Sequence, residues 1–177
     1  GSTGSSSNSS SNSGVNQSFV ANMSISRQTT QAITVVGNGG SYATLTLHTK
    51  RNGIWTETLS CSARVGKNGI TSNKREGDGK TPTGIYSFGQ AFGVAGNPGT
   101  SRGWLQVNNN HYWVDDVNSP YYNKLVDASQ TGIQWSSAEH LIGYPTAYKY
   151  AIAVNYNTAC TPGAGSAIFL HCSTGGS

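Results

Sequence analysis

Apolar and polar side chains alternate with a period of two residues along much of the chain. In residues 42–49, Leu45 and Leu47 lie on one face and the intervening threonine and histidine side chains on the other. Residues 148–156 alternate more clearly, with an aromatic or branched side chain at every second position. This period is typical of strands whose two faces are covered differently. By the same reasoning we expect further strands near residues 32–36, 54–65, 84–88, 104–107, 112–115 and 166–172.

Turn residues separate the expected strands, and helical signals are few. Asn-Gly, Asp-Gly and Pro-Gly pairs supply backbone conformations with positive φ or preset turns. Residues 136–141 favour a short helix, because Ser136 and Glu139 have the spacing of a capping box. Residues 119–128 favour another, with Pro120 at its first position. The chain is therefore predicted to be mostly β, with one or two short helices.

The length and the N-terminal composition indicate one domain preceded by a tether. At 177 residues the chain fits a single domain with a sizeable core. Its first fourteen residues contain only Ser, Gly, Asn and Thr, which cannot bury enough surface to offset the entropy lost on ordering. We expect a flexible tether over residues 1–17 and a folded domain over residues 18–177.

The charge pattern excludes some partners and favours others. Charged residues make up 10% of the sequence, and 11 Lys and Arg against 7 Asp and Glu give a net charge of +4. The cations are scattered rather than interleaved with aromatic residues, so no nucleic-acid partner is expected. A surface of Ser, Thr, Asn and Gly is common in secreted proteins, and a mild positive charge favours an anionic polymer such as a cell wall. No stretch has the length of a membrane span, so a membrane anchor would have to lie upstream of residue 1.

Three cysteines leave the disulfide pattern open. In an oxidising compartment an odd number indicates one pair with one leftover thiol, or a missing fourth cysteine. Cys160 and Cys172 lie on either side of the Pro162-Gly163 turn, which makes a short loop easy to close. Cys61 is the other candidate partner for either of them.

The strongest chemical signal is a histidine near the end of the sequence. In the strand expected at residues 166–172, alternation places Phe169 and His171 on one face and Leu170 and Cys172 on the other. The two side chains of His171 and Cys172 should point apart, so Cys172 is not expected to be a nucleophile paired with this histidine. A Ser/Thr/Gly segment follows, and backbone N–H groups freed by small residues can bind an oxyanion. His171 is therefore a candidate acyl-transfer base, the alternative being a hydrogen-bonded structural histidine.

Other groups of residues carry weaker signals. Residues 76–84 resemble a phosphate loop, but they lack its four-residue gap before Gly-Lys-Thr and no long helix follows, so a long turn is expected. Asp115 and Asp116 lie among aromatic residues, yet as strand neighbours they face opposite ways and lack the spacing of a calcium loop. No metal site is expected, since no metal-ligand spacing joins the remaining histidines, His48, His111 and His140, to one another or to the cysteines.

Three segments, taken in order, resemble the L,D-transpeptidase catalytic domain family, also called YkuD-like, in its secreted Gram-positive variant. Residues 65–69 with 77–86 resemble the family's Asp-Gly-x-Thr-Pro-x-Gly entry to a core strand. Residues 148–155 resemble the strand before the active site, and residues 165–171 the strand that ends at the active-site histidine. The resemblance covers roughly residues 33–177. It implies a mixed-sheet fold of the β-sandwich or barrel-like kind.

The resemblance implies cysteine acyl transfer on the stem peptides of peptidoglycan. A thiolate attacks the carbonyl between the third and fourth stem residues, a terminal D-Ala leaves, and an amine from a neighbouring stem resolves the thioester. Two alternatives stay open: a non-catalytic peptidoglycan-binding module, and an L,D-carboxypeptidase in which water is the acceptor. The protein is expected to be a monomer that is secreted or held at the cell surface, in association with the cell wall.

Residue by residue, the resemblance places the catalytic histidine at His171. It also matches Ser173, Gly175 and Gly176 to the loop that leads to the nucleophile, and it implies no metal or organic cofactor. Tyr144 and Trp113 are candidates for the pocket lining because they lie near the motifs in the sequence. The family's cysteine follows the histidine in a Ser/Thr/Ala-Gly-Cys motif, which would begin near Ser177. The residues up to this point are expected to lack the nucleophile and to be inactive by themselves.

Overall fold

The computed structural model describes residues 16–174, so nearly all of the tether expected over residues 1–17 lies outside the described residues. The chain divides into two compact units. The first unit holds the described part of residues 1–34 together with residues 45–61, and the second holds residues 35–44 with the described part of residues 62–177. Strands dominate both units, so the prediction of a mostly β chain is confirmed.

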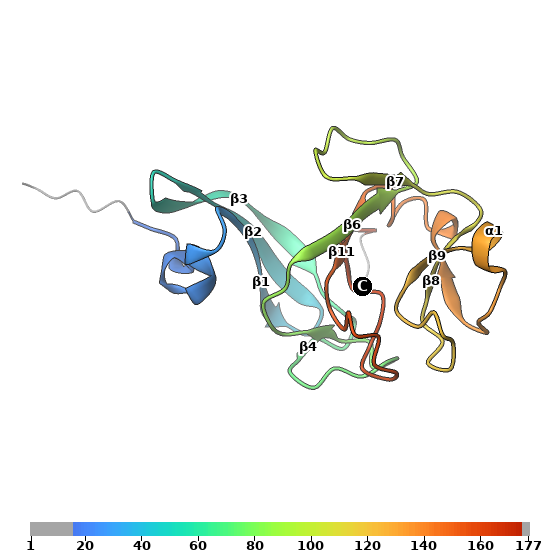
Figure 1. Cartoon of the computed structure of the whole chain (residues 1–177). Coiled ribbons are helices and arrows are strands. Elements are labelled where there is room, and N and C mark those ends of the chain that lie inside the picture. The colour runs from blue at the N-terminus through green and yellow to red at the C-terminus, as the bar shows by residue number, and fades with distance from the viewer. Residues whose placement is uncertain (1–15, 175–177) are drawn as a thin grey trace, which may run out of the picture. The chain divides into compact units, whose positions relative to one another are not determined.

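A three-stranded sheet contributes residues to both units. It is formed by β1 (Gln31–Gly39), β2 (Tyr42–Arg51) and β3 (Ile54–Arg64), in that order (Figure 1). β2 and β3 are joined by the Asn52-Gly53 turn, in which φ is 49° and 77°. An Asn-Gly pair adopts two successive positive φ angles at low cost, which is why the sequence identifies this hairpin correctly.

The first unit is organised around a fully buried histidine on β2. Two short 3₁₀ helices, Phe19–Asn22 and Ser24–Arg27, lie in this unit. His48 Nδ1 lies 2.5 Å from Ser18 Oγ, and its Nε2 lies 2.8 Å from Thr34 Oγ1. Because a hydroxyl can donate or accept, both ring nitrogens are satisfied in the interior. β2 therefore buries a polar side chain, which an alternation of apolar residues alone does not predict.

The second unit contains three further sheets. Its strands are β4 (Ile70–Thr71), β5 (Thr81–Pro82), β6 (Phe88–Gly93), β7 (Trp104–Gln106), β8 (His111–Val114), β9 (Leu125–Asp127), β10 (Ala138–His140), β11 (Ala151–Val154) and β12 (Phe169–His171), with a 3₁₀ helix at Leu141–Gly143. A mixed sheet has the order β12-β11-β6-β7, in which only the β6–β7 pair is parallel (Figure 1). An antiparallel sheet has the order β10-β8-β9, and β4 pairs with β5 in parallel. Within residues 16–174 none of these sheets closes into a barrel.

The core of the second unit is built on Phe92 of β6, which is 0% exposed. Phe169 of β12 packs edge-on against Phe92 with ring centroids 5.1 Å apart, and against Trp113 with centroids 4.8 Å apart. The Tyr148 ring lies 5.5 Å from Phe169 and 5.4 Å from His171. Phe169 and His171 therefore share one face of β12, as the alternation predicts. The remaining buried residues of this core are Val107, Leu141, Ala151 and Ala153.

The prediction of a helix over residues 136–141 is wrong. β10 pairs with β8 instead, and places Glu139 opposite Trp113. The capping-box serine does not cap a helix, because its backbone N–H and its hydroxyl both donate to Asp116 Oδ2 at 2.9 Å. A carboxylate distant in sequence thus takes the hydrogen bonds that the local motif predicts for a helix end.

The prediction of a helix over residues 119–128 is also wrong. Asn123 has a φ of 55°, which an α-helix does not contain, and β9 then pairs with β8. The one α-helix of the described residues, α1 (Ala128–Thr131), follows this strand. Asp127 caps it by accepting a hydrogen bond from the Ser129 N–H at 2.9 Å.

Three predicted strands are displaced or shortened. Residues 84–88 form no strand before Phe88, where β6 begins. β11 and β12 occupy only parts of residues 148–156 and 166–172. Asn157 and Ala167 have φ angles of 49° and 54°, so the chain bends between the two strands where the sequence pattern would extend them.

Phe92→Ala should lower the free energy of unfolding of the second unit by about 3–5 kcal/mol, because it removes a buried ring and leaves a cavity among other rings. Chemical denaturation of the variant and the wild type measures this difference. Ile133→Ala is the matched control, since Ile133 is 67% exposed and its loss should change the stability by less than about 0.5 kcal/mol. Equal losses in the two variants would contradict the assignment of the core.

Candidate functional site

His171 stands at the end of β12 with its imidazole exposed. The strand pairs with β11, in which Ala151 lies opposite His171. The Nδ1 atom of His171 lies 2.8 Å from the backbone oxygen of Cys172. A carbonyl oxygen only accepts, so Nδ1 carries a proton and donates it, and in the neutral ring Nε2 has the lone pair. In this tautomer Nε2, rather than the nitrogen that contacts the backbone, can accept a proton as a general base.

The Tyr148 ring packs against the His171 ring in an edge-to-face contact. The Tyr148 hydroxyl donates a hydrogen bond to the Glu139 carboxylate. Burial raises the pKa of Glu139 above its ordinary value, and the Tyr148 hydrogen bond opposes this rise. Burial and the neighbouring Glu139 both raise the pKa of the Tyr148 hydroxyl. The Tyr148 side chain is thus a neutral hydrogen-bond donor whose hydroxyl is held by Glu139 and whose ring packs on His171.

Within the second unit, neither Cys160 nor Cys172 is positioned as a partner of the imidazole. Cys172 Sγ lies 3.6 Å from the Tyr150 oxygen, and the Cys172 N–H donates to the Ala147 oxygen at 3.0 Å. Cys160 Sγ lies 3.6 Å from the Thr158 oxygen. All three cysteines of the sequence lie within residues 16–174 and are free thiols in the structure. None of the three disulfide pairings that the sequence leaves open is formed.

The loop that leads into β12 is held by a single carboxylate. Glu76 Oε2 accepts a hydrogen bond from the Tyr122 hydroxyl at 2.5 Å and from Ser166 Oγ at 2.7 Å. The Tyr122 oxygen in turn accepts from the Gly165 N–H at 3.0 Å. Burial and the Glu76 carboxylate raise the pKa of Tyr122 to about 12. The motif over residues 76–84 therefore anchors the loop before β12 through its first residue, Glu76.

Asn123 is a second anchor for the same loop. Its Oδ1 accepts hydrogen bonds from Trp113 Nε1 at 3.0 Å and from the Ala167 N–H at 3.2 Å. Its Nδ2 donates to the backbone oxygens of Tyr156 and Asn157 at 3.0 and 2.9 Å. The amide uses its donors and its acceptor at once, which holds both sides of the loop.

The two halves of the motif that carries the family resemblance pack against each other. Asn68 donates from its backbone N–H to the Gly79 oxygen at 2.9 Å and from Nδ2 to the Asp78 oxygen at 2.8 Å. A Cβ on Gly66 would collide with the Gly79 oxygen, so only glycine allows this approach. Residues 65–69 and 77–84 are therefore one structural element.

The Asp78 carboxylate stabilises this element through an ion pair and backbone hydrogen bonds. Lys74 Nζ lies 2.5 Å from Asp78 Oδ1, and the backbone N–H groups of Arg75 and Lys80 donate to the carboxylate at 2.8 and 2.9 Å. Partial burial raises the pKa of Asp78, but the hydrogen bonds from Lys74, Arg75 and Lys80 outweigh it and lower the pKa to about 2.

The residues that the resemblance places in the site have different surroundings. Ser173 is exposed and directly follows the His171-Cys172 pair, whereas Gly175 and Gly176 lie outside the described residues. Tyr144 is 47% exposed, and its ring centroid lies 5.3 Å from that of Tyr148, so it belongs to the surface around His171. Trp113 is half-buried, its ring packs on Phe169 and its Nε1 donates to Asn123, so its place as a pocket-lining residue stays a prediction.

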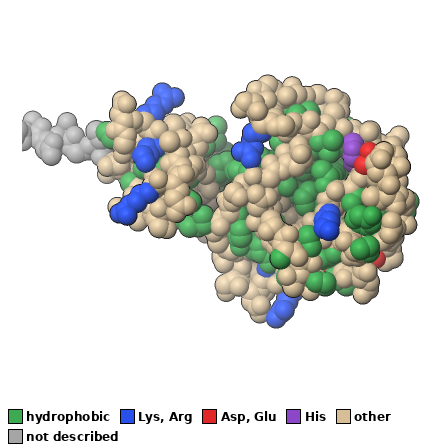
Figure 2. Space-filling model, in the orientation of Figure 1, with side chains coloured by type: hydrophobic (Ala, Val, Ile, Leu, Met, Phe, Trp, Pro, Cys, Tyr) green, Lys and Arg blue, Asp and Glu red, His purple; other side chains and the backbone are tan. Residues whose placement is uncertain are grey.

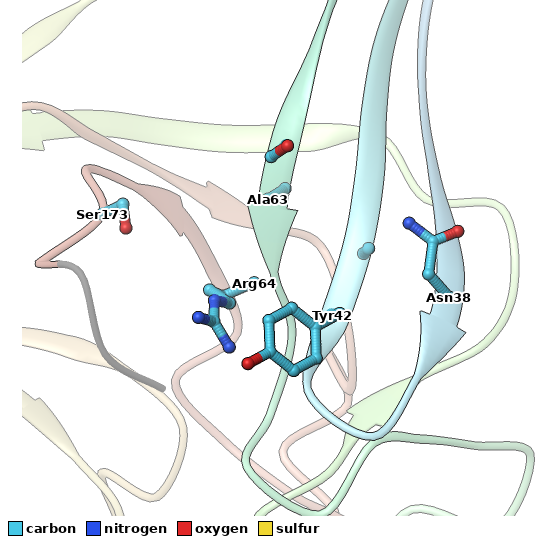
Figure 3. A pocket seen from close by; sticks show the side chains of 7 residues that line it. Asn38, Tyr42, Ala63, Arg64 and Ser173 are labelled. Carbon is cyan, nitrogen blue, oxygen red and sulfur yellow. The ribbon is translucent and has the colours of Figure 1, made fainter.

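A pocket of about 290 Å³ adjoins the segment that follows His171 (Figure 3). Ser173 lines it from one side, and the ends of β1, β2 and β3 line it from the other. The polar residues of its lining are Asn38, Tyr42, Ser62, Arg64 and Ser173. Sequence reasoning missed Tyr42 and Arg64, because only the pairing of the strands brings two residues that are 22 positions apart together.

The surface carries few charges. On the face that Figure 2 shows, lysine and arginine side chains are separate from one another among neutral side chains. Within residues 16–174 no three His, Cys, Asp or Glu side chains are grouped as a metal site would require. No helix among these residues is long and apolar enough to cross a membrane.

The pH dependence of stability should report on Asp78. Because its pKa is lower in the folded state than the ordinary value of 3.8, its interactions stabilise the fold above about pH 4 and are lost as the pH falls through 2. Asp78→Asn should therefore lower Tm at neutral pH and flatten the fall of Tm between pH 4 and 2. Glu57→Gln changes the charge equally on exposed β3 and should keep the wild-type slope. An unchanged slope in Asp78→Asn would contradict the role assigned to this carboxylate.

Tyr148→Phe should lower the free energy of unfolding by about 1–3 kcal/mol, because the partly buried Glu139 carboxylate loses its hydrogen-bond donor. Urea titration measures this loss. Combining it with Glu139→Leu should recover part of the stability, since the carboxylate that lost its partner is then removed as well. Tyr144→Phe serves as the control on an exposed ring and should be close to neutral. A double variant no more stable than Tyr148→Phe would argue against the pairing.

No family model, no curated protein and no solved structure matches this chain. The function must therefore be inferred from the geometry of His171, its supporting residues and the adjoining pocket.

Proposed function

We propose that this chain is an L,D-transpeptidase-like domain that acts on peptidoglycan stem peptides by cysteine acyl transfer. The observation that carries the proposal is the exposed His171 imidazole, whose Nδ1 proton is engaged by a backbone oxygen while Nε2 stays available as a base. The mixed sheet that ends in this histidine is compatible with the sandwich or barrel-like fold that the family resemblance implies. That finer fold is part of the proposal.

In the proposed reaction, Nε2 of His171 takes the proton of a thiol, and the thiolate attacks a stem-peptide carbonyl. A carbon–sulfur bond forms, the carbon–nitrogen bond to the terminal D-Ala breaks, and the imidazolium returns its proton to the leaving amine. An amine of a second stem then displaces the sulfur and forms the cross-link. Backbone N–H groups of the small-residue segment after Ser173 would hold the oxyanion.

The thiol of this mechanism is not one of the cysteines in the described residues. Cys172 follows His171 directly, but its sulfur lies against the Tyr150 oxygen and the imidazole is turned to the Cys172 carbonyl. The proposal instead places the nucleophile in the Ser/Thr/Ala-Gly-Cys motif that the family resemblance implies near Ser177. In this proposal His171 moves the proton. Tyr148 packs against the His171 ring, and Glu139 accepts a hydrogen bond from the Tyr148 hydroxyl and so holds the tyrosine in place.

A second candidate function is a non-catalytic peptidoglycan-binding module. The surroundings of Cys160 and Cys172 favour it, because the contacts of these two thiols do not involve the His171 ring. The sparse charge and net positive balance suit an anionic wall polymer in either case. A location outside the cell, in association with the wall, belongs to both proposals.

Intact-mass spectrometry with a carbapenem tests the enzyme proposal on the protein made from its whole reading frame. An active thiol should gain a covalent adduct, and His171→Ala should slow its formation by at least about 100-fold, because general-base assistance is lost. His140→Ala is the matched control: the His140 Nε2 contacts the Asn109 oxygen and its ring stacks on Tyr112, so the rate should not change.

The outcomes separate the candidates. Retention on purified peptidoglycan with no adduct would favour the binding module. If the protein shows neither retention on peptidoglycan nor an adduct, both proposals are overturned. An adduct formed at the wild-type rate by His171→Ala would refute the assignment of the base.

A further inference from the structure

An arginine is held in a fixed orientation at the end of β3. The Arg64 guanidinium carbon lies 3.8 Å from the centroid of the Tyr42 ring, and Nη1 donates to Ser41 Oγ at 3.3 Å. Tyr42 is itself 58% exposed, so the stacked pair faces solvent at the pocket (Figure 3). Stacking on an aromatic face orients the planar group and lowers the entropy lost when it binds a ligand.

The charge of Arg64 has no acidic partner in this pocket. No aspartate or glutamate lines it, and the only ion pair among residues 16–174 joins Lys74 and Asp78. A guanidinium has five N–H donors, and the bond to Ser41 is a single long one to a neutral hydroxyl. A carboxylate accepts two parallel hydrogen bonds from such a group, which makes it the complementary ligand.

The pocket is small and lies close to the candidate base. Its volume of about 290 Å³ suits the end of a peptide rather than a whole polymer. Ser173 lines the pocket and follows His171 by two residues, so their Cα atoms are at most about 7 Å apart. A chain end held at Arg64 would therefore lie beside Ser173, two residues from the candidate base.

We propose that the Tyr42–Arg64 pocket binds the carboxylate at the C-terminal end of a peptide. The choice of a peptide rests on the proposed function, whereas the choice of a carboxylate rests on the pocket itself. The bound carboxylate takes its hydrogen bonds from the Arg64 guanidinium, and Tyr42 keeps that group in the plane that presents two N–H donors.

The test measures binding and not turnover. N-acetyl-alanyl-D-alanine and its C-terminal amide are titrated into the ¹⁵N-labelled protein, and chemical shifts give the two dissociation constants. The acid should bind at least tenfold more tightly than the amide. Arg64→Gln should weaken binding of the acid at least tenfold, and Arg51→Gln, which removes an exposed arginine from the end of β2, should leave it unchanged.

Two further variants keep the test decisive if Arg64→Gln does not fold. Arg64→Lys keeps the charge but loses the planar fork, and Tyr42→Leu keeps the arginine but removes the ring beneath it. Both should weaken binding of the acid severalfold, while Tyr42→Phe should bind like the wild type. Wild-type affinity in both Arg64→Lys and Tyr42→Leu would overturn the proposal.

The remaining outcomes are equally definite. Equal affinity for the acid and the amide would overturn the proposal, and so would inorganic phosphate bound as tightly as the peptide acid. Loss of the carbapenem adduct together with intact peptide binding would refute the enzymatic function and leave this pocket assignment standing. The reverse result would refute the pocket alone.

Discussion

The packing of Phe169 against Phe92, Trp113 and Tyr148 determines where the chain places His171. β12 is three residues long and pairs with β11 at the edge of its sheet, so its backbone ladder supplies few hydrogen bonds. Edge-to-face aromatic contacts add directional packing to the burial of large apolar surfaces. His171 follows Phe169 by two residues on the same face, so the core that fixes one ring also positions the other.

Polar anchors complete this arrangement where the aromatic core ends. Glu76 binds Tyr122 and Ser166, and Asn123 binds Trp113 and Ala167. These groups are satisfied mainly by partners distant in sequence, and a partly buried carboxylate or amide without its partners would cost free energy. The loop before β12 therefore has a defined path although it contains no regular structure.

His171 directly precedes the short segment that follows β12, and Arg64 lines the same pocket as Ser173 of that segment. His171 offers a lone pair for a proton, and Arg64 offers paired donors for an anion. Acyl transfer on peptides needs both properties, since it removes a proton from a nucleophile and must orient a substrate that ends in a carboxylate. The combination supports a peptide-directed function more strongly than either residue does by itself.

Local sequence patterns predicted those features that depend on neighbouring residues. The β2–β3 hairpin follows from Asn52-Gly53, and the shared face of Phe169 and His171 follows from alternation. The local patterns gave wrong predictions where a partner distant in sequence competes with a local motif. The serines at 136 and 137 bind Asp116 and Asp115 instead of capping a helix, and residues 125–127 pair with β8.

The sequence by itself determined the predominance of strands, their alternating faces and the presence of a histidine at a strand end, because each depends on residues a few positions apart. Only the tertiary structure decided which nitrogen of His171 keeps its lone pair and which residues support its ring. It also decided that Arg64 stacks on Tyr42 and that both residues line one pocket. These properties depend on which strands pair and on which distant groups satisfy each buried donor and acceptor, and the period of a sequence pattern contains no information about either.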